Sequence, residues 1–571
     1  MIETLHHDVL IVGGGAAGIR AAIAAAEKSP KARIAVVSKV YPMRSHTVSA
    51  EGGTAAVMRD YDSFDSHAYD TIKGSDFLAD QDVVEEFVRE APGEVIRLEH
   101  WGCPWSRDPD GKVSSRAFGG MTVKRTVFAT DKVGFHMLHT LYQTSLKFPN
   151  VRYLNEWFVT SLLVDDGRCI GVSAIELATG EMRALTAGAT ILTTGGAGRV
   201  WAFTTNGFIK TGDGMSMAYR AGVPLKDMEF VQYHPTGLPG TGILITEAVR
   251  GEGAYMKNKD GERFLKRYVP NKMELGPRDI LSRAMIQEFE AGRGFKGPYG
   301  DYMVLDLTHI GEEAINKKLP FARELAMNYI GIDPVKDPIP VRPVVHYIMG
   351  GVSTDKHTRT PMKGLLSAGE AACISMNGAN RLGSNSLSEC VVFGARAGAS
   401  AVEDAASAPP PSPAKAASLT SDEWARIQKR FLGTGGTEKL AMIRTDMQAL
   451  MEKNVGVYRS GDGLSEAAAA IPGLRERATR INVMDRNKVF NLELTGCLEL
   501  EFMLDVAETV CQAAVARKES RGSHTRRDFP TRDDANFLKH SLCYRPDGGG
   551  PPRVDYVPAT ITRWQPEERK Y

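Results

Sequence analysis

A run of small residues near the beginning of the chain has the composition of a phosphate-binding turn. It reads Gly13-Gly14-Gly15-Ala16-Ala17-Gly18. In such turns the first glycine permits a tight bend, the second lets the backbone approach a pyrophosphate, and the third lets a helix pack closely on a strand. The pyrophosphate then lies at the helix N-terminus, where unpaired N–H groups and the helix dipole favour negative charge. The motif therefore suggests a dinucleotide bound by Gly13, Gly15, Ala16 and Gly18.

The elements that must position this turn are also present in the sequence. Residues 8–12 are an apolar run of strand length that ends at the first glycine. Residues 16–27 are rich in alanine and contain neither glycine nor proline after Gly18, which predicts a helix. A glycine-rich turn alone is a weak indication of function, but strand, turn and helix follow here in the order that a dinucleotide site requires.

The end of the second predicted strand distinguishes FAD from NAD. An NAD site carries Asp or Glu about 20 residues beyond the glycines, where the carboxylate binds the ribose. In this chain the strand spans residues 34–37 and is followed by Ser38-Lys39, without a carboxylate. We therefore expect FAD as the cofactor, with Ser38 and Lys39 at the nucleotide.

The composition is typical of a soluble globular protein. Of the 571 residues, 43% are hydrophobic and 24% are charged, and the net charge is +1. This length predicts about two to four domains, and the near-neutral charge gives no indication of nucleic-acid binding. The 7 cysteines contain no Cys-x-x-Cys pair, which favours reduced thiols in the cytoplasm over a zinc or iron–sulfur site. No window approaches about 18 consecutive apolar residues, so we expect no transmembrane segment, and the early first strand leaves no room for a signal peptide.

A small, polar segment follows the second strand, at residues 41–53, where an FAD fold would pass the isoalloxazine ring. Within it, Arg44-Ser45-His46-Thr47 followed by Glu51-Gly52-Gly53 resembles the flavin-attachment segment of the flavoprotein subunits of fumarate reductases and succinate dehydrogenases. In that family the histidine at the position of His46 is bonded covalently to the flavin 8α carbon. The resemblance therefore implies covalent FAD with an 8α-histidyl link at His46, and flavin contacts from Thr47, Glu51, Gly52 and Gly53.

The resemblance covers essentially the whole chain and implies further contacts with FAD. Thr194-Gly195 follows a predicted strand at residues 189–192 and is similar to the family's second flavin turn. The implied positions run from the adenine half to the ring, and they are Phe158, Val159, Thr194, Gly195, Asp213, Glu370, Arg381, Ser386 and Leu387.

A dicarboxylate such as fumarate needs cations and hydrogen-bond donors at both ends, placed where negative charge grows during reduction. The resemblance assigns one carboxylate to Arg381, whose planar guanidinium suits two parallel hydrogen bonds. It also implies that His234, Thr246 and His346 bind the substrate and that Phe118 forms an apolar wall.

The proposed reaction moves a hydride between flavin N5 and one alkene carbon while an acid delivers a proton to the other. By resemblance this acid is Arg278, with His234 beside it and a relay through Glu247 and Arg250 to solvent. A free guanidinium has a pKa above about 12 and is normally never deprotonated. The rationale would be pKa matching, because the C–H proton of succinate is itself extremely weakly acidic.

The implied fold class is α/β: an FAD-binding Rossmann-like domain with an inserted α+β capping domain, then a helical domain and a C-terminal tail. The expected ranges are 1–236 and 351–407 for the FAD-binding domain, 237–350 for the capping domain, 422–525 for the helical domain and 526–571 for the C-terminal segment.

Three further features lie in the second half of the chain. Residues 405–421 are rich in proline, alanine and serine, which predicts a linker. Thr420 and Glu423 then form a capping box that would begin a helix, and residues 491–517 predict another helix. The Arg- and Asp-rich run at residues 517–534 is either a solvated face or a docking surface for an iron–sulfur partner.

We expect the catalytic flavoprotein subunit of a membrane-associated fumarate reductase. It would exchange electrons with an iron–sulfur subunit and, through membrane anchor subunits, with quinone, at the cytoplasmic face of the inner membrane. The alternatives are a succinate dehydrogenase flavoprotein, a soluble aspartate oxidase and a non-enzymatic nucleotide-binding subunit. The His46 segment opposes the aspartate oxidase, because that branch holds flavin without a covalent bond.

Glu51 bears on the direction of the reaction. Fumarate reductases of this family tend to carry Glu here, where succinate dehydrogenases tend to carry Gln. An ionised Glu51 close to the ring would oppose the negative charge of the reduced flavin and lower its potential. A glutamate that only accepts backbone hydrogen bonds in the Gly52-Gly53 turn is the alternative. The first interpretation favours fumarate reduction.

Overall fold

The strand before the glycine turn is an inner strand of a seven-stranded sheet in the computed structural model, which describes residues 2–433 and 435–571. This strand, β1 (Glu3–Val12), pairs in parallel with β2 (Ile34–Ser38) and β9 (Glu181–Leu192). The order is β6-β2-β1-β9-β8-β7, with β16 beside β9. The other strands are β6 (Val151–Asn155), β7 (Trp157–Asp165), β8 (Arg168–Glu176) and β16 (Leu365–Ser367). Because β1, β2, β9 and β16 are parallel, their carboxyl ends meet at one edge of the sheet.

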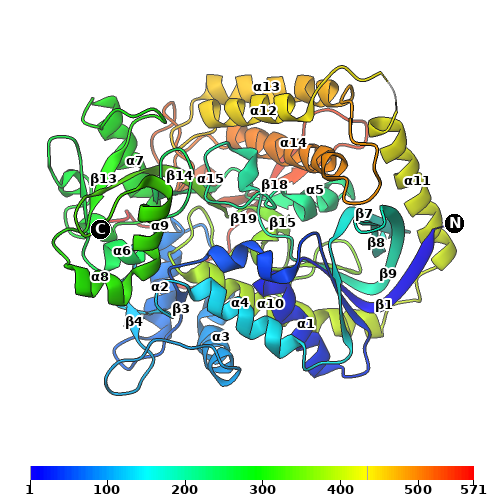
Figure 1. Ribbon diagram of the computed structural model, residues 1–571, viewed down its shortest axis with the longest axis horizontal. Helices are drawn as coiled ribbons and strands as arrows, with labels where there is room; N and C mark the ends of the chain where they lie inside the picture. The colour runs from blue at the N-terminus through cyan, green and yellow to red at the C-terminus, as the bar shows by residue number, and fades with distance from the viewer. Residues whose placement is uncertain (1, 434) are drawn as a thin grey trace.

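Both faces of this sheet are covered. Alternate residues of β1 enter two different hydrophobic clusters: Val9 and Ile11 pack on one side, and Leu10 and Val12 on the other. The first side carries α1 (Ala16–Lys28), as predicted from the alanine-rich run, together with α3 (Gln81–His100), α4 (Val133–Ser145) and α10 (Asn385–Ala406). The second side carries the helical domain, so the mixed α/β fold class is confirmed (Figure 1).

Smaller elements complete this part of the chain. They are α2 (Phe64–Gly74) and a three-stranded sheet of β3 (Thr54–Ala55), β4 (Ser115–Arg116) and β5 (Thr126–Val127).

A second sheet, drawn in green at the left of Figure 1, forms the insertion between the two parts of the FAD-binding region. Its order is β11-β14-β13-β12. Its strands are β11 (Val231–Gly237), β12 (Tyr255–Lys257), β13 (Met303–Asp306) and β14 (Ile339–Ile348), and its helices are α6 (Ala248–Gly251), α7 (Arg278–Glu290), α8 (Glu312–Lys318) and α9 (Pro320–Ile330). The expected capping range of 237–350 contains all of these elements except most of β11.

Most of the helical domain lies at the top of Figure 1, and its first helix lies at the right. Its helices are α11 (Pro413–Phe431), α12 (Leu440–Asn454), α13 (Gly461–Ala478) and α14 (Leu492–Ala516), with α5 (Asp213–Arg220) packed beside α14. The predicted helix at 491–517 is confirmed, and Asn491 caps it by accepting the N–H of Leu494 at 2.8 Å.

The predicted linker at 405–421 is wrong. Helix α10 continues to Ala406, and α11 begins at Pro413, so only a few residues separate them. Ser412 is the N-cap of α11, and Thr420 and Glu423 lie inside the helix rather than at its start. The cause is Pro413 at the first helical position, where its fixed φ and missing N–H favour a helix start.

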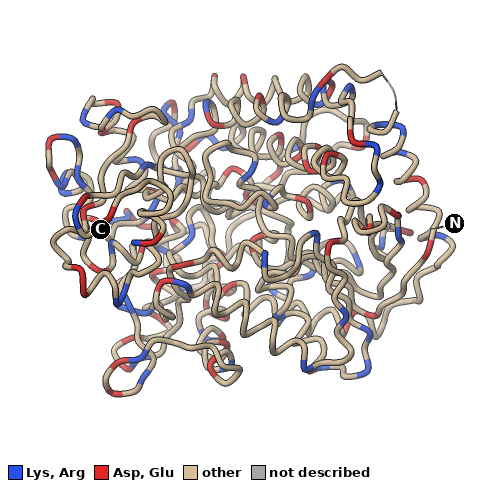
Figure 2. The backbone as a smooth tube through the Cα atoms, in the orientation of Figure 1, with Lys and Arg blue, Asp and Glu red and all other residues tan. Residues whose placement is uncertain are grey.

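The C-terminal segment returns to the FAD-binding part. It adds β18 (Lys539–Tyr544) and β19 (Arg553–Pro558) to β10 (Leu225–Lys226), β15 (Gly351–Ser353) and β17 (Ala372–Cys373) in a five-stranded sheet, and it carries the short α15 (Asp534–Phe537). Figure 2 shows basic and acidic residues interspersed over the whole molecule. Within residues 2–433 and 435–571, no helix combines the length and the apolar character needed to cross a membrane.

The charge run that begins at Arg517 contains both buried and exposed side chains: Arg527 and Asp528 are exposed, whereas the interpretation as a solvated face is wrong for three positions near its start. The side chains of Arg517, Arg521 and His524 have exposed fractions of 1% or less. Arg517 and Arg521 form ion pairs with Glu229, Glu519 and Asp534. His524 Nε2 lies 3.1 Å from the Arg517 carbonyl oxygen.

Candidate active site

A cavity of about 670 Å³ lies between the carboxyl edge of the main sheet and the capping domain. Most of the residues predicted for cofactor and substrate line it, although they come from distant parts of the chain. The cofactor candidates are Gly13, Gly15, Ala16, Ser38, Lys39, His46, Thr47, Glu51, Gly52, Gly53, Val159, Thr194, Gly195, Asp213, Glu370, Arg381, Ser386 and Leu387. The substrate and catalytic candidates are Phe118, His234, Thr246, Glu247, Arg278 and His346. Three of the predicted site residues do not line the cavity and lie behind its wall: Gly18, Phe158 and Arg250.

The glycine turn provides a cradle for a pyrophosphate. Gly13 has φ +118°, a conformation that favours glycine. A side chain at Gly18 would clash with the carbonyl oxygen of Gly13, so Gly18 allows α1 to approach β1. Gly15 is the N-cap of α1 and brings no side chain, so the start of the helix faces the cavity, where the Ala16 N–H donates to Thr47 Oγ1 at 3.2 Å. The helix dipole at this end suits a phosphate, and the site therefore fits FAD.

At the expected nucleotide end of the cavity, the positive charge of Lys39 is paired with two carboxylates. Lys39 Nζ lies 2.8 Å from Asp213 Oδ2 and 2.7 Å from Glu499 Oε1. The strand β7 contributes Val159 to the wall, whereas the ring of Phe158 stacks on Phe502 at 6.2 Å between centroids. Because successive side chains of a strand point to opposite faces, Phe158 supports the wall from behind.

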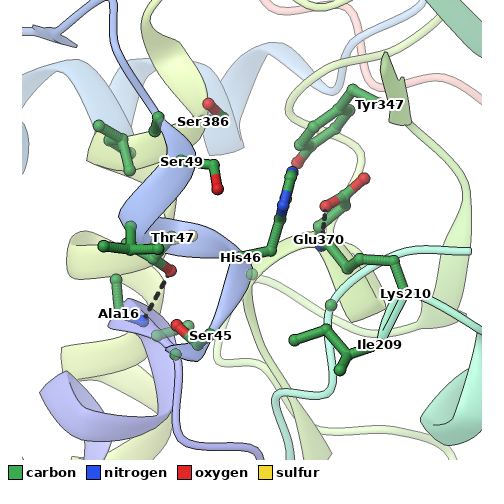
Figure 3. A pocket seen from close by; sticks show the side chains of 18 of the residues that line it. Ala16, Ser45, His46, Thr47, Ser49, Ile209, Lys210, Tyr347, Glu370 and Ser386 are labelled. Carbon is green, nitrogen blue, oxygen red and sulfur yellow. Dashed lines mark hydrogen bonds and ion pairs between the residues drawn. The ribbon is translucent and has the colours of Figure 1, made fainter. Parts of the chain in front are cut away.

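His46 lies on a short 3₁₀ segment, His46–Ser49, and its imidazole points into the cavity near Tyr347, Glu370 and Lys210 (Figure 3). Burial lowers the pKa of His46 to about 3, and the positive charges of Lys210 and Arg199 add to the effect. The Gly207 N–H donates to Nδ1 at 3.4 Å. The imidazole is therefore neutral, which is the form that can act as a nucleophile.

Two features of the cavity wall, beside the position expected for the isoalloxazine ring, were not identified from the sequence. Lys210 forms an ion pair with Glu370, and a side chain at Gly196 would clash with that carboxylate, so the second glycine turn lies directly against the pair. The N-terminus of the 22-residue helix α10 also faces the cavity through Ser386 and Leu387. Its dipole favours negative charge at this point.

Two arginines from different domains meet at the substrate end. Arg278 Nη1 and Arg381 Nη2 each donate to Gln232 Oε1 at 3.0 Å. Both side chains are buried, with exposed fractions of 6% and 2%. Burial lowers the pKa of Arg381 to about 10, and the charge of Arg278 adds to this, but Arg381 remains a cation at neutral pH. Gln232 was missed because nothing in its local sequence marks it.

The two histidines of the site are neutral donors. Burial lowers the pKa of both His234 and His346 well below the ordinary value, with a further effect from Arg278. The Thr236 N–H donates to His234 Nδ1 at 3.2 Å, which assigns the proton to Nε2. Among the residues described, His234 Nε2 has no hydrogen-bond partner although it is buried. A substrate oxygen would satisfy it.

Glu247 connects Arg278 to Arg250, as the predicted relay requires. Its Oε2 lies 2.8 Å from Arg278 Nε and 3.5 Å from Arg250 Nη2. Burial opposes ionisation, but Arg250 and Arg278 outweigh it and lower the pKa of Glu247. Burial lowers the pKa of Arg250. The three buried groups lie in a row, with a hydrogen bond between Arg278 and Glu247 and an ion pair between Glu247 and Arg250.

The prediction that Glu51 is ionised is not supported. The side chain is buried, and its Oε2 has no hydrogen-bond partner in the described part of the chain. Burial and the nearby Asp131 carboxylate raise the pKa of Glu51 well above its ordinary value. The neutral carboxyl is therefore the favoured form, and the predicted lowering of the flavin potential does not follow from it.

The sequence and the structure both match known flavoproteins. The family profile described as FAD binding domain matches residues 8–387, and the profile described as fumarate reductase flavoprotein C-term matches residues 444–571. The chain is 56% identical to a fumarate reductase flavoprotein subunit of Mycobacterium tuberculosis, with 100% of both chains covered. It is 42% identical to a succinate dehydrogenase flavoprotein subunit of Rickettsia bellii, covering 98% of this chain and 96% of that one. A solved quinol-fumarate reductase with menaquinol molecules superposes with a TM-score of 0.96 at 50% identity, covering 99% of this chain and 100% of that one.

Proposed function

Because this chain belongs to the family of fumarate reductase and succinate dehydrogenase flavoprotein subunits, we propose that it reduces fumarate to succinate as the catalytic subunit of a quinol-linked complex. The observation that supports this proposal best is the meeting of Arg278 and Arg381 on one oxygen of Gln232, inside a cavity that also holds the glycine cradle. Two guanidinium groups that each lie 3.0 Å from the same oxygen suit a small dianion.

The chain's own residues would bind and orient the dicarboxylate. Arg381 would hold one carboxylate, and the Nε2–H of His234 and the hydroxyl of Thr246 would hold the other. Phe118, which packs against Gly52, would keep water from the reacting carbons. Reduced FAD, when bound, would supply a hydride, which carries both electrons. Arg278 would give a proton to the second carbon and recover it through Glu247 and Arg250.

A simple assay tests the proposed function. Fumarate should be reduced by the FAD-loaded protein with a reduced viologen dye as electron donor. A flavin-loaded protein that binds dicarboxylate but shows no turnover with fumarate or succinate would contradict the proposal.

We propose that FAD is attached covalently at His46. The support is the position of His46 inside the cavity and its neutral imidazole. His46→Ser is expected to fold and to retain FAD without a covalent bond, because the glycine cradle does not depend on the link. In this family an 8α substituent raises the flavin potential, so succinate oxidation should fall more than fumarate reduction. Flavin fluorescence that stays with acid-denatured mutant protein would place the attachment elsewhere.

The relatives' names support a membrane-associated complex. They are flavoprotein subunits, and one solved relative is a quinol-fumarate reductase with menaquinol. We infer an iron–sulfur subunit as the electron partner and membrane anchor subunits with quinone beyond it, at the cytoplasmic face of the inner membrane. The buried members of the charge run, Arg517 and Arg521, cannot contact this partner, whereas Arg527 and Asp528 are exposed and accessible to it.

The proposed direction of catalysis, fumarate reduction, is supported by the sequence identity to relatives rather than by Glu51. Identity is 56% to the fumarate reductase relative and 42% to the succinate dehydrogenase relative. A succinate dehydrogenase working in the oxidative direction remains the second candidate. The ratio of the two turnover rates in the assembled complex would distinguish them.

Glu51→Gln tests the protonation of this buried carboxyl. A neutral glutamic acid and a glutamine carry the same charge, so we expect the flavin potential to change by less than about 30 mV, equivalent to about 1.4 kcal/mol for two electrons. Spectroelectrochemical titration of the bound flavin measures this potential. An upward shift of several tens of millivolts would show that Glu51 is ionised in the flavin-loaded protein.

A further inference from the structure

Arg569, near the end of the chain, bridges two carboxylates that belong to different domains. Its Nε lies 3.2 Å from Asp76 Oδ1, and its Nη2 lies 2.6 Å from Asp279 Oδ2. The exposed fraction of its side chain is 7%, so this is a buried bridge rather than a surface ion pair. Asp76 is ionised, because the positive charges of Arg569, Arg521 and Arg532 outweigh the effect of burial and lower its pKa to about 2.

On the capping side, the bridge holds the first turn of the helix that carries Arg278. Asp279 is the next residue of α7, and its side chain is 1% exposed. The N-cap of α7 is Pro277, which contributes no side-chain hydrogen bond. Arg283, one turn later, also contacts Asp279 Oδ2 at 3.1 Å and donates to the Gly522 carbonyl at 2.7 Å. The ion pairs of Asp279 therefore help to hold this turn in place, together with the hydrogen bonds of Arg278 to Glu247 and Gln232.

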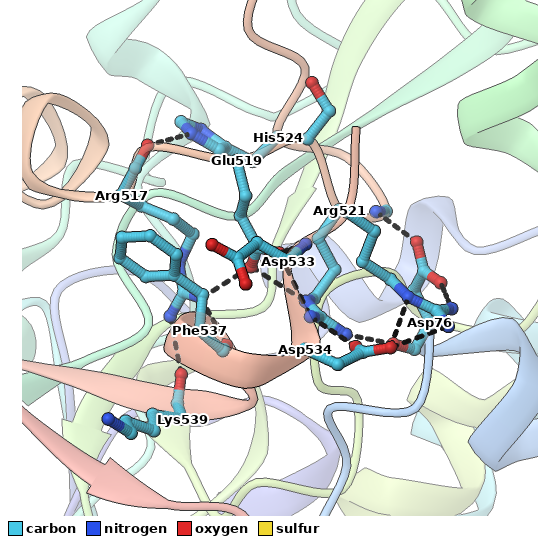
Figure 4. Close-up of polar contacts among 12 residues, drawn as sticks. Asp76, Arg517, Glu519, Arg521, His524, Asp533, Asp534, Phe537 and Lys539 are labelled. Atoms are coloured by element: carbon cyan, nitrogen blue, oxygen red, sulfur yellow. Dashed lines mark hydrogen bonds and ion pairs between the residues drawn. The ribbon is translucent and has the colours of Figure 1, made fainter. Parts of the chain in front are cut away.

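On the other side, the bridge holds the turn that supports Arg381. Asp76 has φ 55°, and its Oδ2 accepts the Gly522 N–H at 2.8 Å. Figure 4 shows Asp76 within a network of charged groups that includes Arg521 and Asp534. The same turn accepts a hydrogen bond from Asn380, whose Nδ2 lies 3.0 Å from the Gly74 carbonyl oxygen. Asn380 directly precedes Arg381 in the chain.

The two residues that follow Arg569 lie against the same two domains. Lys73 of α2 donates to the Lys570 carbonyl at 3.0 Å, and its Nζ lies 4.8 Å from the centroid of the Tyr571 ring. Tyr571 in turn packs against the hydrophobic cluster of the capping domain. Residues 569–571 thus connect the FAD-binding part with the capping domain at several points.

We propose that Arg569 is a positioning residue that fixes the spacing between Arg278 and Arg381. These two cations share a single acceptor, Gln232 Oε1, and they repel each other when no dicarboxylate lies between them. Arg569 attaches the first turn of α7, which carries Arg278, to the Asp76 turn that supports Arg381, and so opposes their separation. The inference rests on the proposed function, because it assumes that Arg278 donates the proton.

Arg569→Ala tests the proposal in the FAD-loaded chain. We expect kcat for fumarate reduction to fall by about 10- to 100-fold, since a misplacement near 1 Å has effects of this size, while KM changes much less. Arg569→Lys retains the charge but cannot contact both aspartates with a fork, and it should recover part of kcat. The matched control is Arg563→Ala, which removes an exposed ion pair of the same segment with Asp65, and it should leave kcat unchanged.

A double-mutant cycle separates positioning from general destabilisation. If Arg569 acts through Arg278, the change Arg569→Ala should have no further effect on kcat once Arg278 is alanine. Equal losses in both backgrounds would overturn the proposal, as would a lower melting temperature with unchanged kcat in Arg569→Ala. High turnover in Arg278→Ala alone would instead refute the proposed role of Arg278, so the two failures are distinguishable.

Discussion

Arg278→Ala should lower turnover by about 10²–10⁴-fold in both directions, the usual scale for removing a general acid. Flavin binding should persist, because Arg278 lies at the substrate end of the cavity. Dicarboxylate binding should weaken only modestly, since Arg381, His234 and Thr246 remain. The measurement is kcat for fumarate reduction and for succinate oxidation, with dicarboxylate affinity followed by the absorbance of the bound flavin.

The geometry gives the physical reason for this expectation. Arg278 donates from Nε to Glu247 and from Nη1 to Gln232, so its guanidinium is oriented by two acceptors on opposite sides. Alanine removes the donor and leaves the Glu247 carboxylate with Arg250 and the Gly119 N–H, at 3.5 and 2.6 Å. Glu247 is therefore not orphaned, and the protein should still fold.

Arg278→Lys is the matched control for the acid. It keeps a positive charge but has one compact ammonium in place of a planar fork, so it cannot reach Glu247 and Gln232 in the same way. We expect it to bind dicarboxylate better than the alanine variant and to remain poorly active. Turnover above about a tenth of the wild-type rate in Arg278→Ala would mean that another group supplies the proton.

The local parts of the fold could be predicted from the sequence. The strand, turn and helix around Gly13 depend on neighbouring residues, and the structure places them as expected in β1 and α1. The helix at α14 was predicted for the same reason. The linker error shows the limit of this approach, because a proline that usually ends a helix instead begins α11.

The parts of the site that depend on distant contacts could not be predicted. Gln232 and Lys210 gain their roles only when the chain brings Arg381 and Glu370 to them. Glu51 was expected to be ionised because its surroundings were unknown, and burial beside Asp131 reverses that expectation. Arg569 acquires its partners from positions several hundred residues away.

Arg381→Ala should affect binding first. We expect KM for fumarate to rise by about 10²–10⁴-fold. A charge-assisted hydrogen bond contributes about 1.5–3 kcal/mol, and about 1.4 kcal/mol corresponds to a tenfold change in affinity. The loss of two such bonds to one carboxylate accounts for this range. Removing the buried cation leaves Gln232 Oε1 with Arg278 as its donor, so no acceptor is stranded.

The contrast between the two arginine variants is the sharpest test of their roles. Arg278→Ala should lower kcat with a small effect on affinity, whereas Arg381→Ala should weaken the binding of a non-reacting dicarboxylate such as malonate, which needs no proton. Arg381→Lys should restore part of that affinity, because an ammonium in this position still attracts a carboxylate but cannot bind it through two parallel N–H groups. If malonate binds Arg381→Ala as tightly as the wild type, the carboxylate is held elsewhere. The Arg381 guanidinium, which lies 4.5 Å from the centroid of the Tyr347 ring, would then stabilise the fold rather than bind the substrate.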